Sequence, residues 1–312
     1  MSKIDVHCHY VPDFYRAALI ASDLIRPDGI PADVPAWSEQ SALAAMDQLG
    51  VGKSYLSISS PGVHFGDDTA ARALARQVNE EGARLARAHP DRFGFFASTP
   101  LPDVDAALDE IAYALDELGA AGVVFATNFR GIYLGSDRLE PVYAELDRRN
   151  AIVFLHPTSP AAPCTGAAPE LPYPRPMLEF MFDTTRTVTD MVLAGVLDRH
   201  PNLRVIVPHA GAALPLLTSR IDAIGGMVTG KEQPMRKALR RLHFDVAGLP
   251  VPEMLPALRS VADPAHIHYG SDWPFTPLPR VQSLAAQFDT VPELGANWPD
   301  TALRENSQAL LG

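Results

Sequence analysis

Strand-like segments alternate with helical segments eight times along this chain, and this alternation limits the folds that it can adopt. The predicted strands are residues 3–9, 51–59, 93–97, 122–126, 151–155, 203–207, 243–246 and 267–269. Mostly apolar strands that are separated by helices are typical of a parallel sheet with covered faces. Eight such units predict an α/β fold, a closed (β/α)8 TIM barrel, as a single domain over residues 1–312. An open doubly wound sheet is the alternative, but no Gly-rich dinucleotide-binding turn follows the first strand.

The helices carry recognisable start and stop residues. Ser38 is the predicted N-cap of a helix that Gly50 ends, and Asp103 caps a helix that Gly119 ends. Further helices are predicted at residues 69–88, 137–149, 177–199, 214–224 and 253–260, and from Val281 and from Asp300. Residues 10–37 have no clear period and are rich in proline, so we expect a long functional loop there.

The composition restricts the partners. The formal net charge is -11, which argues against nucleic acid or an anionic membrane as a partner. No stretch has the roughly 20 uninterrupted apolar residues that a transmembrane helix needs. Cys8 and Cys164 are the only two cysteines in the sequence. They provide no disulfide framework and suit a reducing compartment, so we expect a cytoplasmic protein.

Five candidate metal-binding residues stand at the ends of predicted strands. His7 and His9 lie on one face of the first strand, because successive side chains of a strand alternate. His156, His209 and Asp272 follow three later strands. Each could satisfy ordinary hydrogen bonds, but strand ends converge at one mouth of a barrel, which favours a shared metal site. Three imidazoles and a carboxylate suit Zn²⁺ or Mn²⁺, and the additional histidine could orient or deprotonate a bound water or substrate group.

The motifs at these strand ends resemble those of a known superfamily. They are His7-x-His9, His156-Pro157, Pro208-His209-Ala210-Gly211 and Gly270-Ser271-Asp272-Trp273-Pro274-Phe275. This set is similar to the amidohydrolase superfamily, in the branch that contains aminocarboxymuconate-semialdehyde decarboxylase, gamma-resorcylate decarboxylase and 6-methylsalicylate decarboxylase. The resemblance spans essentially the whole chain. Residues 58–64 and 178–186 look most like the 6-methylsalicylate decarboxylase group.

The resemblance implies a ligand set. One divalent cation, Zn²⁺ or Mn²⁺, would be bound by His7, His9, His156 and Asp272. His209 would hydrogen-bond the substrate or a water at the open position of the metal. Two-metal members of the superfamily carry a carboxylated lysine on strand four, where this chain has Phe125-Ala126-Thr127-Asn128, so one metal is expected. The resemblance also implies that Arg220 binds the substrate carboxylate and that the protein is a homodimer, in which this arginine can be contributed across the interface. Without the family, Arg220 could equally be a solvated charge on a helix.

The resemblance also implies a reaction. We expect a nonoxidative decarboxylase of a small hydroxylated aromatic acid such as 6-methylsalicylate, with Asp272 or His209 protonating the ring carbon. The aminocarboxymuconate enzyme has an arginine where this chain has Trp37-Ser38-Glu39, which favours a monocarboxylate. The alternative keeps the metal site and uses a metal-bound hydroxide to hydrolyse a lactone or an amide. A third alternative, a non-catalytic metal-binding scaffold, explains the histidine and aspartate residues at the strand ends less well.

Further residues are candidates for substrate contact. Phe14, Trp273 and Phe275 are apolar residues that could wall an aromatic ring. His64 and Asn128 lie just past the second and fourth strands, as substrate contacts or as loop caps. Cys8 is expected to face the helix layer, away from the two histidines that flank it.

Overall fold

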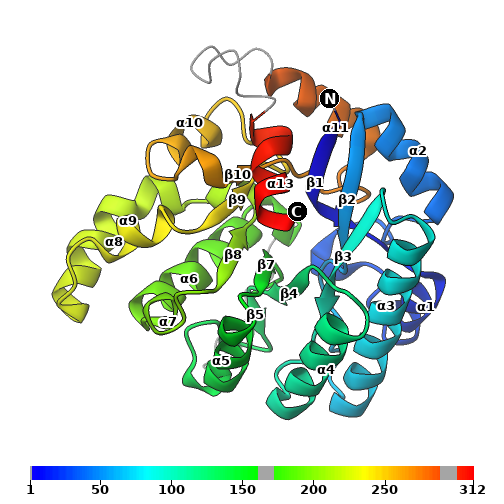
Figure 1. Cartoon of the computed structure of the whole chain (residues 1–312), viewed down its shortest axis with the longest axis horizontal. Coiled ribbons are helices and arrows are strands. Elements are labelled where there is room, and N and C mark those ends of the chain that lie inside the picture. The colour runs from blue at the N-terminus through cyan, green and yellow to red at the C-terminus, as the bar shows by residue number, and fades with distance from the viewer. Residues whose placement is uncertain (1, 161–171, 289–300) are drawn as a thin grey trace.

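Eight parallel strands form one sheet, with helices around them (Figure 1). The structure, a computed structural model, describes residues 2–160, 172–288 and 301–312. Strands lie in the order β1 (Lys3–His9), β2 (Val51–Ser57), β3 (Phe93–Ser98), β4 (Gly122–Ala126), β7 (Ile152–His156), β8 (Arg204–Val207), β9 (His243–Asp245) and β10 (Ile267–His268). Val6 N donates to the Tyr269 carbonyl at 3.0 Å and His9 N to the Trp273 carbonyl at 2.8 Å, which joins β1 to the β10 segment. The predicted (β/α)8 barrel is confirmed.

The helices up to residue 259 connect successive strands on the outside of the barrel, and the later ones follow the last strand. They are α1 (Asp13–Ala21), α2 (Glu39–Leu49), α3 (Asp68–Ala88), α4 (Val104–Asp116), α5 (Glu140–Arg148), α6 (Glu179–Leu193), α7 (Val196–Arg199), α8 (Leu214–Thr229), α9 (Pro234–Leu239), α10 (Met254–Arg259), α11 (Leu278–Phe288) and α13 (Asn306–Leu311). Among the described residues, no helix combines the length and apolarity that crossing a membrane requires.

The predicted caps of α2 and α4 are present. Ser38 Oγ accepts a hydrogen bond from Ser41 N at 3.1 Å, and Ser41 Oγ accepts one from Ser38 N at 2.9 Å, which is a reciprocal capping pair. Gly50 ends α2 with φ +66°, a left-handed conformation that glycine adopts without strain. Asp103 accepts a hydrogen bond from Ala106 N at the start of α4.

Other predicted boundaries were wrong. The expected loop over residues 10–37 contains α1, whose Tyr15 and Leu19 are buried one helical turn apart, a spacing too short to stand out as a period in the sequence. The helix expected over residues 177–199 is interrupted at Gly195, where φ is +77°. A two-stranded hairpin, β5 (Asn128–Phe129) and β6 (Ile132–Tyr133), and helix α9 were not predicted. Asp300 and Cys164 lie outside the described residues.

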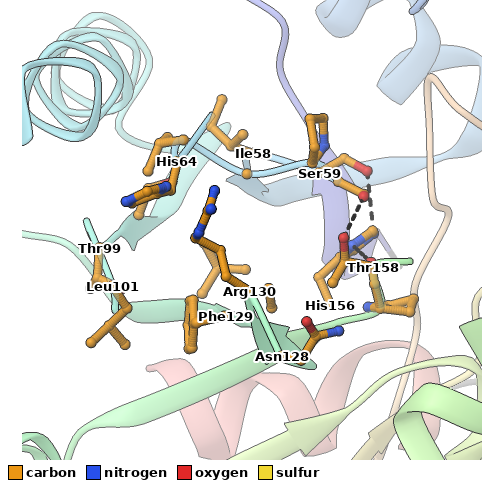
Figure 2. Close-up of a pocket in the computed structure, with 18 of the residues that line it drawn as sticks. Ile58, Ser59, His64, Thr99, Leu101, Asn128, Phe129, Arg130, His156 and Thr158 are labelled. Carbon is orange, nitrogen blue, oxygen red and sulfur yellow. Dashed lines mark hydrogen bonds between the residues drawn. The ribbon is translucent and has the colours of Figure 1, made fainter. Parts of the chain in front are cut away.

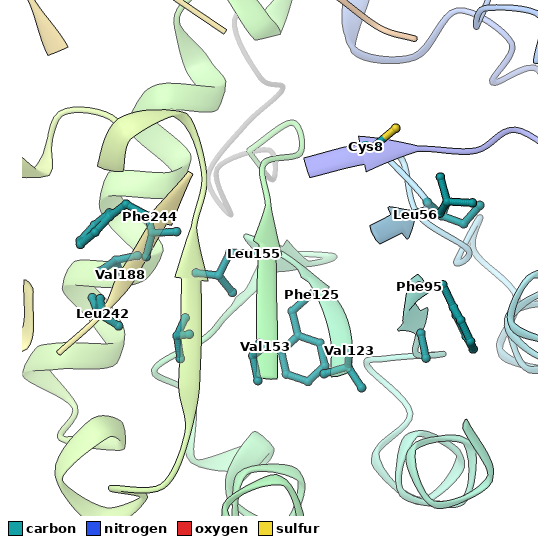
Figure 3. Close-up of a cluster of buried hydrophobic side chains, with 14 of the residues drawn as sticks. Cys8, Leu56, Phe95, Val123, Phe125, Val153, Leu155, Val188, Leu242 and Phe244 are labelled. Atoms are coloured by element: carbon teal, nitrogen blue, oxygen red, sulfur yellow. The ribbon is translucent and has the colours of Figure 1, made fainter. Parts of the chain in front are cut away.

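The apolar core has two layers. Side chains on the outer face of the strands, such as Phe125, Leu155 and Phe244, pack with Val188 of α6 and other helical residues (Figure 3). Alternate side chains, including Phe96, Phe154 and Ile206, fill the barrel interior, and Leu310 of α13 packs with them. This alternation follows from the period of two along each strand.

Strand β1 changes face part-way along. Val6 belongs to the interior layer, whereas Cys8 belongs to the outer layer that packs against helices. The register of β1 against β2 shifts between Asp5 and Cys8, and such an irregularity re-aims the side chains that follow it. The shift turns His7 and His9 toward the interior, and the expectation that Cys8 faces the helix layer is confirmed.

Asp183 joins the loop after β4 to α6. Its carboxylate is fully buried and accepts hydrogen bonds from Thr127 Oγ1 at 2.5 Å, Asn128 Nδ2 at 2.9 Å and Tyr133 OH at 2.6 Å. Arg186 of the same helix supplies the compensating charge at 2.9 Å. The hairpin β5–β6 is therefore held in place by one buried side chain.

We expect Asp183→Ala to lower the free energy of unfolding by at least about 3 kcal/mol, because several buried donors lose their acceptor. Urea unfolding measures the change. Asp198→Ala is the matched control, since Asp198 is 60% exposed and its ion pair with Lys231 is worth at most about 1 kcal/mol. Equal destabilisation by the two variants would contradict this account of the hairpin.

Candidate active site

Backbone carbonyls fix the orientation of two imidazoles at the barrel mouth. His9 Nδ1 donates to the Ser57 carbonyl at 3.2 Å, and His156 Nδ1 donates to the Pro157 carbonyl at 2.8 Å. A carbonyl oxygen only accepts, so the hydrogen of each neutral ring lies on Nδ1. Burial lowers the pKa of both histidines. Their Nε2 atoms therefore present lone pairs to the site.

His7 is oriented by a carboxylate instead. Its Nδ1 donates to Asp245 Oδ2 at 2.9 Å, and both side chains are fully buried. Burial alone lowers the pKa of His7, but Asp245 and Asp272 raise it to about 10. The two carboxylates thus favour positive charge on His7 at this position, which either a proton or a metal cation can supply.

Asp272 completes a compact group of four potential ligands. Its Oδ1 lies 3.5 Å from His7 Nε2 and 3.2 Å from His9 Nε2. Burial alone raises the pKa of Asp272, but hydrogen bonds with His7 and His9 hold it well below the usual range. One ligand atom from each of His7, His9, His156 and Asp272 lies within 4.8 Å of all the others. Lone pairs and negative charge that converge so closely fit one divalent cation with nitrogen and oxygen ligands.

The backbone around Asp272 is strained and tightly packed. Asp272 has φ +57°, a left-handed conformation that is uncommon outside glycine, and its N donates to the His7 carbonyl at 2.8 Å. Two residues earlier, a Cβ added at Gly270 would lie only 2.8 Å from His7 Cβ. Glycine is thus required where this segment passes β1, and the close approach places the Asp272 carboxylate against the histidines.

A cavity of about 770 Å³ opens beside this group. His156, His209 and Asp272 line it together with apolar side chains that include Phe180, Met181 and Phe275. The Phe275 ring lies 5.4 Å from the His9 ring, measured between centroids. A mostly apolar cavity with a few convergent polar groups is typical of a site for a small organic ligand.

His209 lies beside the four-residue group. Its ring centroid is 5.1 Å from that of His7, and its backbone has φ +54°. Burial and the nearby His7 lower the pKa of His209 to about 4, so the ring is neutral near pH 7. Among the described residues, its buried Nδ1 has no hydrogen-bond partner, which leaves that nitrogen for a ligand or water.

Of the six residues predicted to contact substrate, five do not line this cavity, and three of these five line neither cavity. Trp273 packs in the outer core with 9% exposure, and its carbonyl accepts from His9 N, so the residue stabilises the barrel seam. Phe14 is 38% exposed on α1 and is not among the lining residues. Arg220 is exposed on α8 and does not line the cavity of its own chain. Phe275 alone among the predicted ring contacts faces the cavity.

His64 and Asn128 line a second, smaller cavity (Figure 2). His64 Nδ1 accepts from Gly66 N, and its Nε2 bonds the Asp68 carboxylate at 2.8 Å. The side-chain amide of Asn128 donates to Asp183 and to the Ser159 carbonyl, while its oxygen accepts from Gly131 N. The polar atoms of both residues are occupied, so the structure favours their reading as loop caps.

Asp245 was missed by sequence reasoning. It ends β9 and binds His7, and its other oxygen accepts from His209 N and Ala247 N at 3.0 Å each. The signal was present, because Asp245 stands near the carboxyl end of the predicted strand 243–246. Applying the strand-end rule to every strand would have found it.

Comparison with known proteins assigns the family. The model of the family described as Amidohydrolase matches residues 4–312. The chain belongs to the amidohydrolase family. Among curated family relatives, the 6-methylsalicylic acid decarboxylase of Aspergillus aculeatus is 36% identical over 325 residues, covering 99% of this chain and 95% of the relative. A gamma-resorcylate decarboxylase of Rhizobium sp. is 28% identical over 255 residues, covering 76% of this chain and 77% of the relative.

Solved structures agree with the amidohydrolase assignment. A crystal structure described as amidohydrolase II has a TM-score of 0.93 at 39% identity and covers 99% of each chain. The 5-carboxyvanillate decarboxylase of Novosphingobium aromaticivorans, crystallised with manganese, has a TM-score of 0.82 at 20% identity, covering 99% of this chain and 96% of its own. The first relative supports the family, and the second supports the fold.

We expect Asp245→Asn to weaken divalent-metal binding by about 10- to 100-fold, because residues that orient a histidine ligand affect metal affinity on that scale. Competition with a chromogenic chelator measures the affinity for Zn²⁺ and Mn²⁺. Asp263→Asn is the control, since Asp263 caps the turn before β10 through a bond to Ala265 N. Unchanged affinity in Asp245→Asn would show that Asp245 does not position His7 for a metal.

Proposed function

We propose that this protein is a nonoxidative decarboxylase of a small hydroxylated aromatic acid, with 6-methylsalicylate as the leading candidate. The observation that carries the proposal is the group His7, His9, His156 and Asp272 at the edge of an aromatic-lined cavity. The curated relatives described above carry decarboxylase names, which favours this reaction over hydrolysis of a lactone or amide.

One divalent ion, Zn²⁺ or Mn²⁺, would be held by the same four residues. When bound, such an ion acts as a Lewis acid that orients the carboxylate and ortho-hydroxyl oxygens of the substrate and draws charge from them. The nitrogen and oxygen donor set suits both metals. Manganese in the crystallised 5-carboxyvanillate decarboxylase supports Mn²⁺ as one of the two candidates.

Asp272 would take up a proton from solvent and deliver it to the ring carbon that bears the carboxylate. The carbon–carbon bond then breaks, CO₂ leaves, and the electron pair restores the aromatic ring. The Asp272 carboxylate lines the cavity, and Thr276 Oγ1 donates to its Oδ2 at 2.8 Å, which fixes the orientation of the group. His209 would hydrogen-bond the substrate through the nitrogen that has no described partner. Phe180 and Phe275 would hold the ring and exclude water.

We expect Asp272→Asn to lower kcat for decarboxylation of 6-methylsalicylate by about 10²–10⁴-fold, the range for loss of a positioned acid. Release of CO₂ is measured alongside metal content, because the three histidines should retain part of the metal. Asp198→Asn, an exposed carboxylate on α7, serves as the control. If Asp272→Asn holds metal and keeps its turnover, Asp272 is not the general acid.

We further propose a homodimer that uses α8. Leu216, Ile224, Met227 and Val228 are 51–85% exposed on this helix. Their spacing places them on one stripe, and Arg220 lies within the same stripe. Burying this stripe against a second copy would cover the apolar side chains and could bring Arg220 to the carboxylate of a substrate in the partner. The exposed position of Arg220 in a single chain supports this arrangement.

We expect Met227→Glu to convert the dimer to a monomer and to raise KM for the aromatic acid at least tenfold, because charge would be buried in an apolar contact. Light scattering coupled to size exclusion measures the mass. Ile20→Glu, which alters a 58% exposed apolar residue on α1, should change neither property. A wild-type protein that is monomeric at micromolar concentration would contradict the dimer.

The partner that we propose is thus a small organic acid in the cytoplasm. The net charge of -11 disfavours nucleic acid and anionic membranes as partners. Cys8 is a buried thiol without a disulfide among the described residues, which suits a reducing compartment.

A further inference from the structure

The second cavity lies at the same mouth of the barrel as the metal-ligand group. It has a volume of about 230 Å³ and is bordered by the loops after β2, β3, β4 and β7. Ser59, Ser60 and His156 line both this cavity and the larger one. The two cavities are thus neighbours that share a polar wall, and the proposed reaction leaves the smaller one without a role.

Arg130 occupies an unusual backbone position at the edge of this cavity. Phe129 pairs with Ile132, so Arg130 and Gly131 form the two-residue loop of the β5–β6 hairpin. Both have positive φ, +53° and +87°, as in a type I′ turn. Asn, Asp or Gly normally fills the first of these positions, because larger side chains are strained there. An arginine in this place breaks the local rule, which is a mark of functional sites.

The guanidinium of Arg130 projects over the cavity (Figure 2), toward His64. Its Nη1 would lie 3.6 Å from a Cβ built on Gly66, so the head group reaches the loop after β2. Within residues 2–160, 172–288 and 301–312, no acceptor is recorded for Arg130, although this acidic chain pairs many of its other arginines. A guanidinium without an acceptor favours binding of carboxylate-like anions, because it can form two parallel hydrogen bonds with them.

Thr99 supplies an independent polar group in the lining of the cavity. Its side chain is 5% exposed, and its Oγ1 has no hydrogen-bond partner among the described residues. Thr99 lines the cavity beside Leu101 (Figure 2). A buried hydroxyl without a partner is unfavourable by about 1–3 kcal/mol, so such a group is expected to meet a ligand or water.

We propose that this cavity binds a small carboxylate-type anion, held by the Arg130 guanidinium and the Thr99 hydroxyl. The volume is below the roughly 300 Å³ at which drug-sized pockets begin, which favours an anion of a few heavy atoms or the carboxylate end of a larger acid. His64 and Asn128 shape the wall without offering free polar atoms. The anion is either a free small carboxylate or the carboxylate of an aromatic acid.

Binding of ¹³C-formate to the zinc-loaded full-length protein tests the proposal. Line broadening of the formate resonance is followed in a buffer that contains no other carboxylate or bicarbonate. Arg130→Asn removes the cation and keeps a residue that tolerates the left-handed turn. Thr99→Val removes the hydroxyl at nearly equal volume. We expect formate affinity to fall at least tenfold in Arg130→Asn and at least threefold in Thr99→Val.

Arg138→Gln is the matched control, because Arg138 is an exposed arginine that follows the same hairpin and lies outside the cavity. Its formate affinity should equal that of the wild type. The wild type and the three variants should all bind formate at zinc. Only the part of the formate binding that is lost in Arg130→Asn therefore reports on this site. Superimposable titrations of wild type and Arg130→Asn would overturn the proposal.

Adding salicylate distinguishes the two sources of the anion. Displacement of the Arg130-dependent formate would assign the site to the carboxylate of an aromatic acid, and retention would assign it to a separate small anion. Each result supports an anion site. The readout is binding alone, so it remains valid if the protein decarboxylates none of the acids tested.

Discussion

The hydrogen bond from His7 Nδ1 to Asp245 connects the first barrel strand to β9 across the interior. It joins two fully buried groups, so neither can exchange its partner for water. The same carboxylate accepts from His209 N, and the His7 carbonyl accepts from Asp272 N. One buried pair therefore orients His7, a proposed metal ligand, and links it to the segments that carry His209 and Asp272. The positions of His7, His209 and Asp272 therefore all depend on this contact.

The repeating features of the fold were accessible from the sequence. Alternating strands and helices predicted the barrel because each unit buries its apolar face in the same way. The hidden features are local exceptions. Helix α1 has only two turns of apolar spacing, and the register shift in β1 that turns His7 and His9 inward arises from pairing with β2. Period and propensity describe one segment at a time, so they do not report how two strands pair.

The candidate site likewise combines residues that the sequence predicts with others whose position depends on the local backbone. His7, His9, His156 and Asp272 stand at strand ends, and convergence follows from barrel geometry. Trp273 was expected at the substrate as an apolar residue that could wall an aromatic ring, but the left-handed turn at Asp272 directs the tryptophan into the outer core. Asp245 also stands at a strand end, that of β9, so the same strand-end signal marks it. The direction in which a side chain points after a strained residue such as Asp272 can be predicted only when the backbone conformation is known.

The account rests on one divalent ion held by His7, His9, His156 and Asp272. Anomalous diffraction at the manganese edge, from crystals grown with Mn²⁺, tests this claim most directly. We predict a single strong peak about 2.0–2.3 Å from the three Nε2 atoms and one Asp272 oxygen. A protein crystallised with excess Mn²⁺ that shows no peak between these residues, or a peak elsewhere in the barrel, would contradict it.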